Sequence, residues 1–108
     1  MLHDTLNTFC NDAHRLAVAK GWYRQDREPP ELIALIHSEL SEMLEAYRHD
    51  NPPSDKIPEF TAAEEEAADV VIRLCDMAAH MGMRLGEAVE AKHEFNRGRP
   101  DRHGGKRY

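Results

Sequence analysis

The sequence predicts an all-α protein: an antiparallel helical bundle of about four helices, followed by a basic, irregular C-terminal tail. Three observations indicate this class. Apolar residues recur every three or four positions along most of the 108 residues, and the alternation typical of strands is nearly absent. Glycine and proline residues mark the breaks between these segments. Aromatic residues make up only 6% of the chain, which suits helices better than a sandwich or a barrel.

The first two helices are defined by their apolar spacing and by the residues at their ends. Helical spacing begins at Leu2 and continues to about Lys20, and Gly21 is a natural C-terminal stop. The second helix is expected to begin at Pro29-Pro30, because proline suits the first turn of a helix, and to end near Arg48. The residues expected to face inward from it are Leu32, Ile33, Ile36, Leu40, Met43, Leu44 and Tyr47.

The third helix is expected from about Thr61 to about His80. Thr61 and Glu64 have the spacing of a capping box, and Gly82 ends the helical pattern. Its inward residues are expected to be Ala63, Ala67, Val70, Val71, Leu74, Met77 and Ala78. A fourth helix is predicted over about Leu85 to Asn96, and the basic tail, residues 97–108, is expected to be irregular unless a ligand or partner holds it.

Length, charge and cysteine content limit the classes of function. The chain is expected to form one domain, residues 1–108, with a modest core that favours a dimer or larger assembly. Two cysteines without disulfide-framework spacing, and the lack of an apparent signal peptide, predict a reduced, cytoplasmic protein. No apolar stretch is long enough to predict a membrane span. A net charge of −6 argues against binding to a nucleic-acid polymer.

The charges are also segregated along the chain. Residues 31–69 contain eleven acids and two bases, a balance of −9, whereas residues 92–108 contain six bases and two acids, a balance of +4. These two segments either neutralise each other at the surface or bind the cation and the anion of one shared ligand.

Two pairs of carboxylates have the same spacing: Glu39 with Glu42, and Glu66 with Asp69. At about 100° per residue, both pairs lie on the same flank of their apolar stripes. If the two helices pack antiparallel across their short connector, both pairs lie roughly 8–13 Å from the same turn. Four carboxylates would then converge, and their repulsion calls for a cation. Oxygen donors without paired histidine or cysteine favour Mg²⁺, with Mn²⁺ as the alternative.

The simpler interpretation is that each pair belongs to a solvated helix flank, since ExxE is frequent on helix surfaces. The matched face and height of the two pairs favour a shared metal site. The neighbouring acids that fall off this face, and are expected to be solvated, are Glu45, Glu64 and Glu65. Asp76, one heptad after Asp69, could support the site, whereas the histidines show no ligand pairing and Cys75 is expected to be inert.

The basic end of the chain offers counter-charges for an anion. Lys92 and Asn96 are one helical turn apart and share a face, and Arg97 and Arg99 follow them. Mg²⁺ held by carboxylates usually keeps positions open for substrate phosphates, so this cluster is a candidate phosphate site. Taken singly, each of these bases also fits an ordinary surface role.

The combination of these patterns resembles a known family. The ExxE of Glu39 and Glu42, followed after 23 intervening residues by the ExxD of Glu66 and Asp69, resembles the signature of the MazG-like all-α nucleoside triphosphate pyrophosphohydrolases. The tail KHEFNRGRPDRHGGKR is similar to the Lys-x-x-x-Asn-Arg-x-Arg-Pro ending common in that group, and KGWYRQ to its Gly-Trp segment. The resemblance covers most of the chain, although the longest members fuse two such domains and this chain has one.

The resemblance implies Mg²⁺-dependent hydrolysis of a (deoxy)nucleoside triphosphate to the monophosphate and pyrophosphate, as in housecleaning of the nucleotide pool. It implies metal ligands at Glu39, Glu42, Glu66 and Asp69, of which Glu39 and Glu42 would be catalytic. It implies phosphate or sugar contacts at Lys92, Asn96, Arg97 and Arg99. Trp22 would form a wall for the base, and a role as a core or interface aromatic is an equal alternative.

The resemblance also implies a homodimer or homotetramer. Two rival functions stay open from the sequence. One is a phosphoribosyl-ATP pyrophosphohydrolase, against which the KHEFNRGRP ending counts. The other is a helical interaction module without turnover, in which the acids are ordinary surface and the tail docks a partner.

Overall fold

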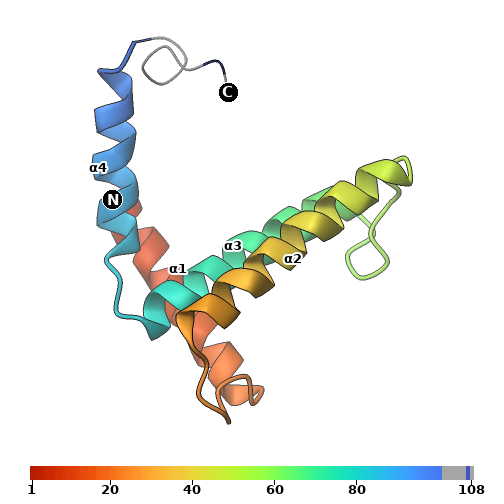
Figure 1. The fold of residues 1–108 in the computed structure, drawn as a ribbon, viewed down its shortest axis with the longest axis horizontal. Coiled ribbons are helices and arrows are strands. Elements are labelled where there is room, and N and C mark those ends of the chain that lie inside the picture. Colours follow the sequence, from red (N-terminus) through yellow and green to blue (C-terminus); the bar gives the residue numbers. More distant parts are fainter. Residues whose placement is uncertain (101–106, 108) are drawn as a thin grey trace.

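The computed structural model describes residues 1–100 and 107 and forms four helices in chain order. These are α1 (Leu2–Ala19), α2 (Pro29–Arg48), α3 (Ala62–His80) and α4 (Leu85–Arg97) (Figure 1). Among the described residues no strand forms, and the one extended pairing is an isolated bridge between Pro53 and Thr61. The all-α prediction is therefore confirmed, with helix bounds within one residue or so of those expected. The predictions made for tail residues 101–106 and 108 lie outside the described part of the chain.

The helices form a hairpin with two further helices at its base. α2 and α3 run antiparallel and side by side, α1 packs across α3 near the base of this hairpin, and α4 packs on α1 (Figure 1). The hairpin extends away from α1 and α4 over much of its length. α3 is thus the central helix of the fold, because it contacts both α2 and α1.

The turn between α2 and α3 fixes the register of the hairpin. Asp50 and Asn51 adopt left-handed backbone conformations (φ 63° and 49°), which Asp and Asn tolerate better than most residues. The Asn51 side-chain oxygen accepts a hydrogen bond from the Ala63 N–H at 2.9 Å. The predicted capping box is confirmed: Thr61 Oγ1 accepts from the Glu64 N–H at 3.1 Å, and Glu64 Oε1 accepts from the Thr61 N–H at 3.0 Å.

The core of the molecule lies between α1 and α3 and consists of small side chains. Cys10, Ala13, Cys75 and Ala78 are buried together there. Both cysteines are free. Burial, together with the neighbouring Cys10, raises the pKa of the Cys75 thiol to about 12, so this buried thiol is a poor nucleophile.

The prediction that both apolar stripes face inward is wrong for much of the hairpin. The exposed fractions of its large apolar side chains include 45% for Leu40, 54% for Leu44, 60% for Tyr47 and 51% for Val71. Ile33, Ile72 and Leu74 are exposed as well. The reason is that α2 packs mainly on α3, and one neighbouring helix cannot cover a wide stripe. Within the described residues, none of the four helices combines the length and apolar character needed to cross a membrane.

Candidate functional site

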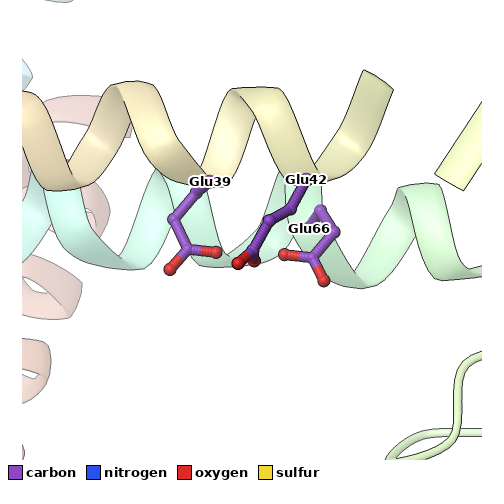
Figure 2. A group of neighbouring side chains, drawn as sticks. All are labelled: Glu39, Glu42 and Glu66. Carbon is purple, nitrogen blue, oxygen red and sulfur yellow. The ribbon is translucent and has the colours of Figure 1, made fainter. Parts of the chain in front are cut away.

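Three of the predicted carboxylates meet on one side of the hairpin. Glu39 and Glu42 extend from α2 and Glu66 from α3, and one carboxylate oxygen of each lies within 4.8 Å of the others. Figure 2 shows the three side chains pointing to the same side, below the two helix axes. The antiparallel pairing across the short connector therefore brings them together as the spacing predicted.

The fourth predicted carboxylate, Asp69, lies one turn farther along α3. It forms a second group with Glu65 and Glu66, again with oxygens within 4.8 Å of one another. Glu66 belongs to both groups, so the acids form a strip instead of one four-membered cluster. We call the three-carboxylate group of Glu39, Glu42 and Glu66 the acidic cluster.

The prediction that Glu65 is solvated is wrong. Its side chain is only 15% exposed, because the connector between α2 and α3 folds back over it. The buried Ser54 donates its hydroxyl to Glu65, and Lys56 Nζ lies 3.7 Å from the other carboxylate oxygen. Glu45 and Glu64 are exposed, as expected.

The charges within the acidic cluster are partly offset by Arg73. Glu39 is only 7% exposed, and its Oε1 accepts a hydrogen bond from Arg73 Nε at 2.7 Å. Burial alone would raise the pKa of Glu39, but the hydrogen bonds from Arg73, Glu66 and Glu42 outweigh it, and the pKa falls below its usual value. Glu39 therefore keeps its negative charge.

The pKa of Glu66 shifts in the opposite direction. Burial, followed by hydrogen bonds that the protonated Glu66 donates to Glu39 and Glu42 and by repulsion from their charges, raises the pKa of Glu66 to about 7. Burial, and then the charge of Glu39, also raises the pKa of Asp69. Near neutral pH, the metal-free acidic cluster is thus balanced by the Arg73 guanidinium and by a proton that Glu66 holds about half of the time.

The donor set fits a hard divalent cation. Glu66 Oε2 is buried and makes no hydrogen bond, so the cluster contains an oxygen that lacks a partner. An acceptor in that state is costly unless a cation or a donor satisfies it. Because the three converging ligands are carboxylates, without nitrogen or sulfur, the chemistry favours Mg²⁺ or Mn²⁺ over zinc.

Arg73 also connects the acidic cluster to an aromatic wall. Its guanidinium carbon lies 4.7 Å from the centre of the Trp22 ring, and that of Arg27 lies 4.2 Å from it. Trp22, predicted as a wall for a base, is therefore half-buried and in contact with two guanidinium groups.

An open cavity of about 260 Å³ lies beside this wall, between α1 and α3. Ala13, Ala17 and Ile72 give it apolar sides, and Trp22 lies at its edge. Asp69 and Asp76 both line it. Because these two residues are seven positions apart on α3, they are separated by about 10 Å along the helix axis.

Asp76 is the centre of a polar network that the sequence did not predict. Its Oδ1 lies 2.8 Å from His14 Nδ1, and its Oδ2 accepts from the Tyr23 hydroxyl at 2.9 Å. The Tyr23 ring stacks on His80 with centroids 4.2 Å apart. The heptad spacing from Asp69 was the only signal for Asp76, and nothing in the sequence marked His14 or Tyr23 as its partners.

The predicted phosphate contacts lie on α4 or just after its end, away from the acidic cluster. α4 packs on α1 and points away from the hairpin, so Lys92, Asn96, Arg97 and Arg99 do not join the carboxylates within one chain (Figure 1). The Asn7 side-chain oxygen accepts from the Gly86 N–H at 2.9 Å and fixes the start of α4 against α1.

The same four residues have local surroundings of their own. Lys92 and Asn96 line a separate shallow pocket of about 370 Å³, in which Asn96 Oδ1 is buried without a hydrogen bond. Arg97 Nε lies 3.6 Å from Glu94, and Lys92 and Arg99 lie over the Phe95 ring.

Comparison with protein-family models, with curated proteins and with solved structures gives no significant match for this chain.

Proposed function

We propose that the protein is a Mg²⁺-dependent pyrophosphohydrolase of the MazG-like kind, which converts a (deoxy)nucleoside triphosphate to the monophosphate and pyrophosphate. One observation carries the proposal: three carboxylates from two helices converge, and one of them, Glu66, has a buried oxygen without a hydrogen-bond partner. Mn²⁺ would serve as an alternative cation. Housecleaning of the nucleotide pool is the cellular role that this activity would serve.

The carboxylates would have different roles in the reaction. When bound, Mg²⁺ neutralises triphosphate charge and lowers the pKa of an attacking water. Glu39 and Glu66 would hold the cation, with Glu39 kept in position by Arg73. Glu42 is the exposed member of the acidic cluster and would accept the proton of the attacking water while also serving as a ligand. Asp69 would extend the ligand set toward the cavity beside Trp22.

We propose that the active form is a homodimer or homotetramer. The apolar side chains of the hairpin that a single chain leaves exposed offer a surface for a second copy: Ile33, Leu40, Leu44, Tyr47, Val71, Ile72 and Leu74. A second copy could also supply the phosphate contacts that one chain holds away from its own carboxylates. Those contacts are Lys92, Asn96, Arg97 and Arg99. Two buried free cysteines agree with action in the reducing cytoplasm.

Pyrophosphate release from a panel of ribo- and deoxyribonucleoside triphosphates, with and without Mg²⁺, tests the proposal. Glu39→Gln and Asp69→Asn should reduce kcat by about a hundredfold or more, because each removes a ligand charge. Glu45→Gln is the matched control, since Glu45 lies on the same helix but is exposed and pairs with Arg48 and His49.

Three results would contradict the proposal or its assignment of the site. No turnover of any nucleotide by the wild type, together with no Mg²⁺-dependent rise in the melting temperature, would favour the interaction module. Turnover confined to phosphoribosyl-ATP would favour the histidine-pathway activity. Unchanged turnover in Glu39→Gln would show that the acidic cluster is not the active site.

A further inference from the structure

Asp76 is a buried carboxylate at the wall of a cavity, and the reaction proposed above does not use it. It is only 6% exposed, yet it lines the cavity between α1 and α3. His14 and Tyr23 each contact one of its oxygens, at 2.8 and 2.9 Å. These two contacts come from outside α3 and hold the carboxylate in one orientation, so Asp76 is preorganised to receive a further donor.

The cavity has the shape and position of a base-binding site. Its volume of about 260 Å³ lies below the roughly 300–1,000 Å³ of pockets that enclose a whole ligand, so it suits one part of a nucleotide. Its sides are mostly apolar, with Trp22 at the edge. Asp69 lines the same cavity and shares the acidic strip with Glu66, so phosphates at the acidic cluster would leave the base near Asp76.

The chemistry of a carboxylate selects among bases. Each Asp76 oxygen accepts one hydrogen bond within the protein, and a carboxylate oxygen can accept two. A carboxylate accepts hydrogen bonds and donates none, so it favours a base edge with adjacent N–H donors. Guanine has such an edge in N1–H and its amino group. Uracil and thymine have one N–H between two carbonyl oxygens, which a carboxylate repels.

From this geometry we propose that the cavity between α1 and α3 binds the nucleobase and that Asp76 selects guanine-type bases, with adjacent N–H donors, over uracil and thymine. The proposal rests on the proposed function and deepens it by naming the substrate class. Lys20, which lines the same cavity, is a cation that could donate to the guanine carbonyl.

The single tryptophan of the chain provides a direct assay. Guanosine and uridine, which carry no phosphate, are titrated into the wild-type protein in a metal chelator, and Trp22 fluorescence is recorded. Guanosine should change the fluorescence saturably, and uridine should bind about tenfold more weakly or worse. Asp76→Asn replaces one acceptor by a donor, so guanosine affinity should fall about tenfold while uridine affinity does not fall.

Matched variants separate recognition from folding. Asp12→Asn changes an exposed acid of α1 that does not line the cavity, and it should keep the preference for guanosine. Tyr23→Phe removes one of the two contacts that orient Asp76 but keeps the carboxylate, so the preference should weaken without being lost. Ala17→Leu fills the cavity and should weaken both nucleosides. If Asp76→Asn does not fold, the wild type, Tyr23→Phe and Ala17→Leu still decide the question.

Equal affinities for guanosine and uridine in the wild type, no saturable response to either, or an unchanged preference in Asp76→Asn would overturn the inference. Its failure is distinguishable from failure of the proposed function. Mg²⁺-dependent pyrophosphate release with equal kcat/KM for dGTP and dUTP would remove only the base selection. Nucleoside discrimination without any hydrolysis would remove only the pyrophosphohydrolase.

Discussion

Binding of Mg²⁺ to the acidic cluster should depend steeply on pH, because the cation must displace the proton that Glu66 holds. The pKa of Glu66 is raised to about 7 by burial and by Glu39 and Glu42. At about pH 6, one unit below that value, roughly ten Glu66 side chains are protonated for each ionised one. Mg²⁺ affinity should therefore be about tenfold weaker at about pH 6 than at about pH 8.

Calorimetric titration at both pH values, in two buffers of different ionisation enthalpy, measures the affinity and the number of protons released. Close to one proton per bound ion is expected near pH 6 and almost none near pH 8. Glu66→Gln should bind weakly at both pH values and lose the dependence, whereas the exposed Glu45→Gln should retain it. Equal affinities at the two pH values, without proton release at the lower one, would refute this reasoning.

The raised pKa of Glu66 also contributes to the pH dependence of stability in the absence of metal. The pKa of Glu66 is raised on folding from its usual value of 4.5 to about 7, so between these values the folded state binds more protons than the unfolded state. The contribution of Glu66 to the free energy of unfolding should therefore fall as pH rises through this window. Saturating Mg²⁺ should abolish this fall, because the bound ion would keep Glu66 ionised in the folded state and the unfolded group is also ionised above its usual pKa.

Three further predictions follow from single contacts. Arg73→Gln should lower the free energy of unfolding without metal by about 1–3 kcal/mol, because it leaves the charge of Glu39 buried without its partner. Mg²⁺ should restore more of this loss than in the control Arg27→Gln, which also loses a contact with Trp22. Equal effects of Mg²⁺ on the two variants in urea unfolding would contradict this. Thr61→Ala should cost about 1 kcal/mol and lower the melting temperature by about 4–8 °C through loss of the capping box, and an unchanged calorimetric melting curve would show that the cap is dispensable. Leu44→Glu should convert an assembly to monomers in sedimentation velocity, whereas Val18→Glu, at a similarly exposed position on α1, should not; the opposite pattern would move the interface to α1.

The fold was predictable from the sequence because its helices carry local signals at their ends. Thr61 and Glu64 have capping-box spacing, and the structure forms both hydrogen bonds of that box. Gly21 and Gly82 follow the ends of α1 and α3 with φ of 87° and 68°, a conformation that glycine adopts at little cost. Such signals depend on neighbours along the chain, so they survive without knowledge of tertiary contacts.

What could not be predicted is the direction of α4 and the path of the connectors. A tail rich in bases suggested contact with the acidic segment, but Asn7 binds the start of α4 to α1 and directs it elsewhere. The connector residue Ser54 covers Glu65, which helix geometry alone had placed in solvent. Both outcomes depend on contacts between residues far apart in sequence or in irregular segments, where periodicity carries no information.

The convergence of the carboxylates was predictable from the sequence, but the groups that neutralise them were not. An antiparallel hairpin brings residues at equal distance from its turn to the same height, which is why Glu39, Glu42 and Glu66 meet. Residue spacing on ideal helices predicts the repulsion between these carboxylates, but it does not predict the groups that relieve that repulsion. Arg73 lies one turn after Asp69 and neutralises Glu39, and the raised pKa of Glu66 lets that side chain hold a proton near neutrality. Because Arg73 and the Glu66 proton both act on the carboxylates themselves, a divalent cation bound at the proposed site would have to compete with each of them, and its affinity would rise as these two interactions weaken.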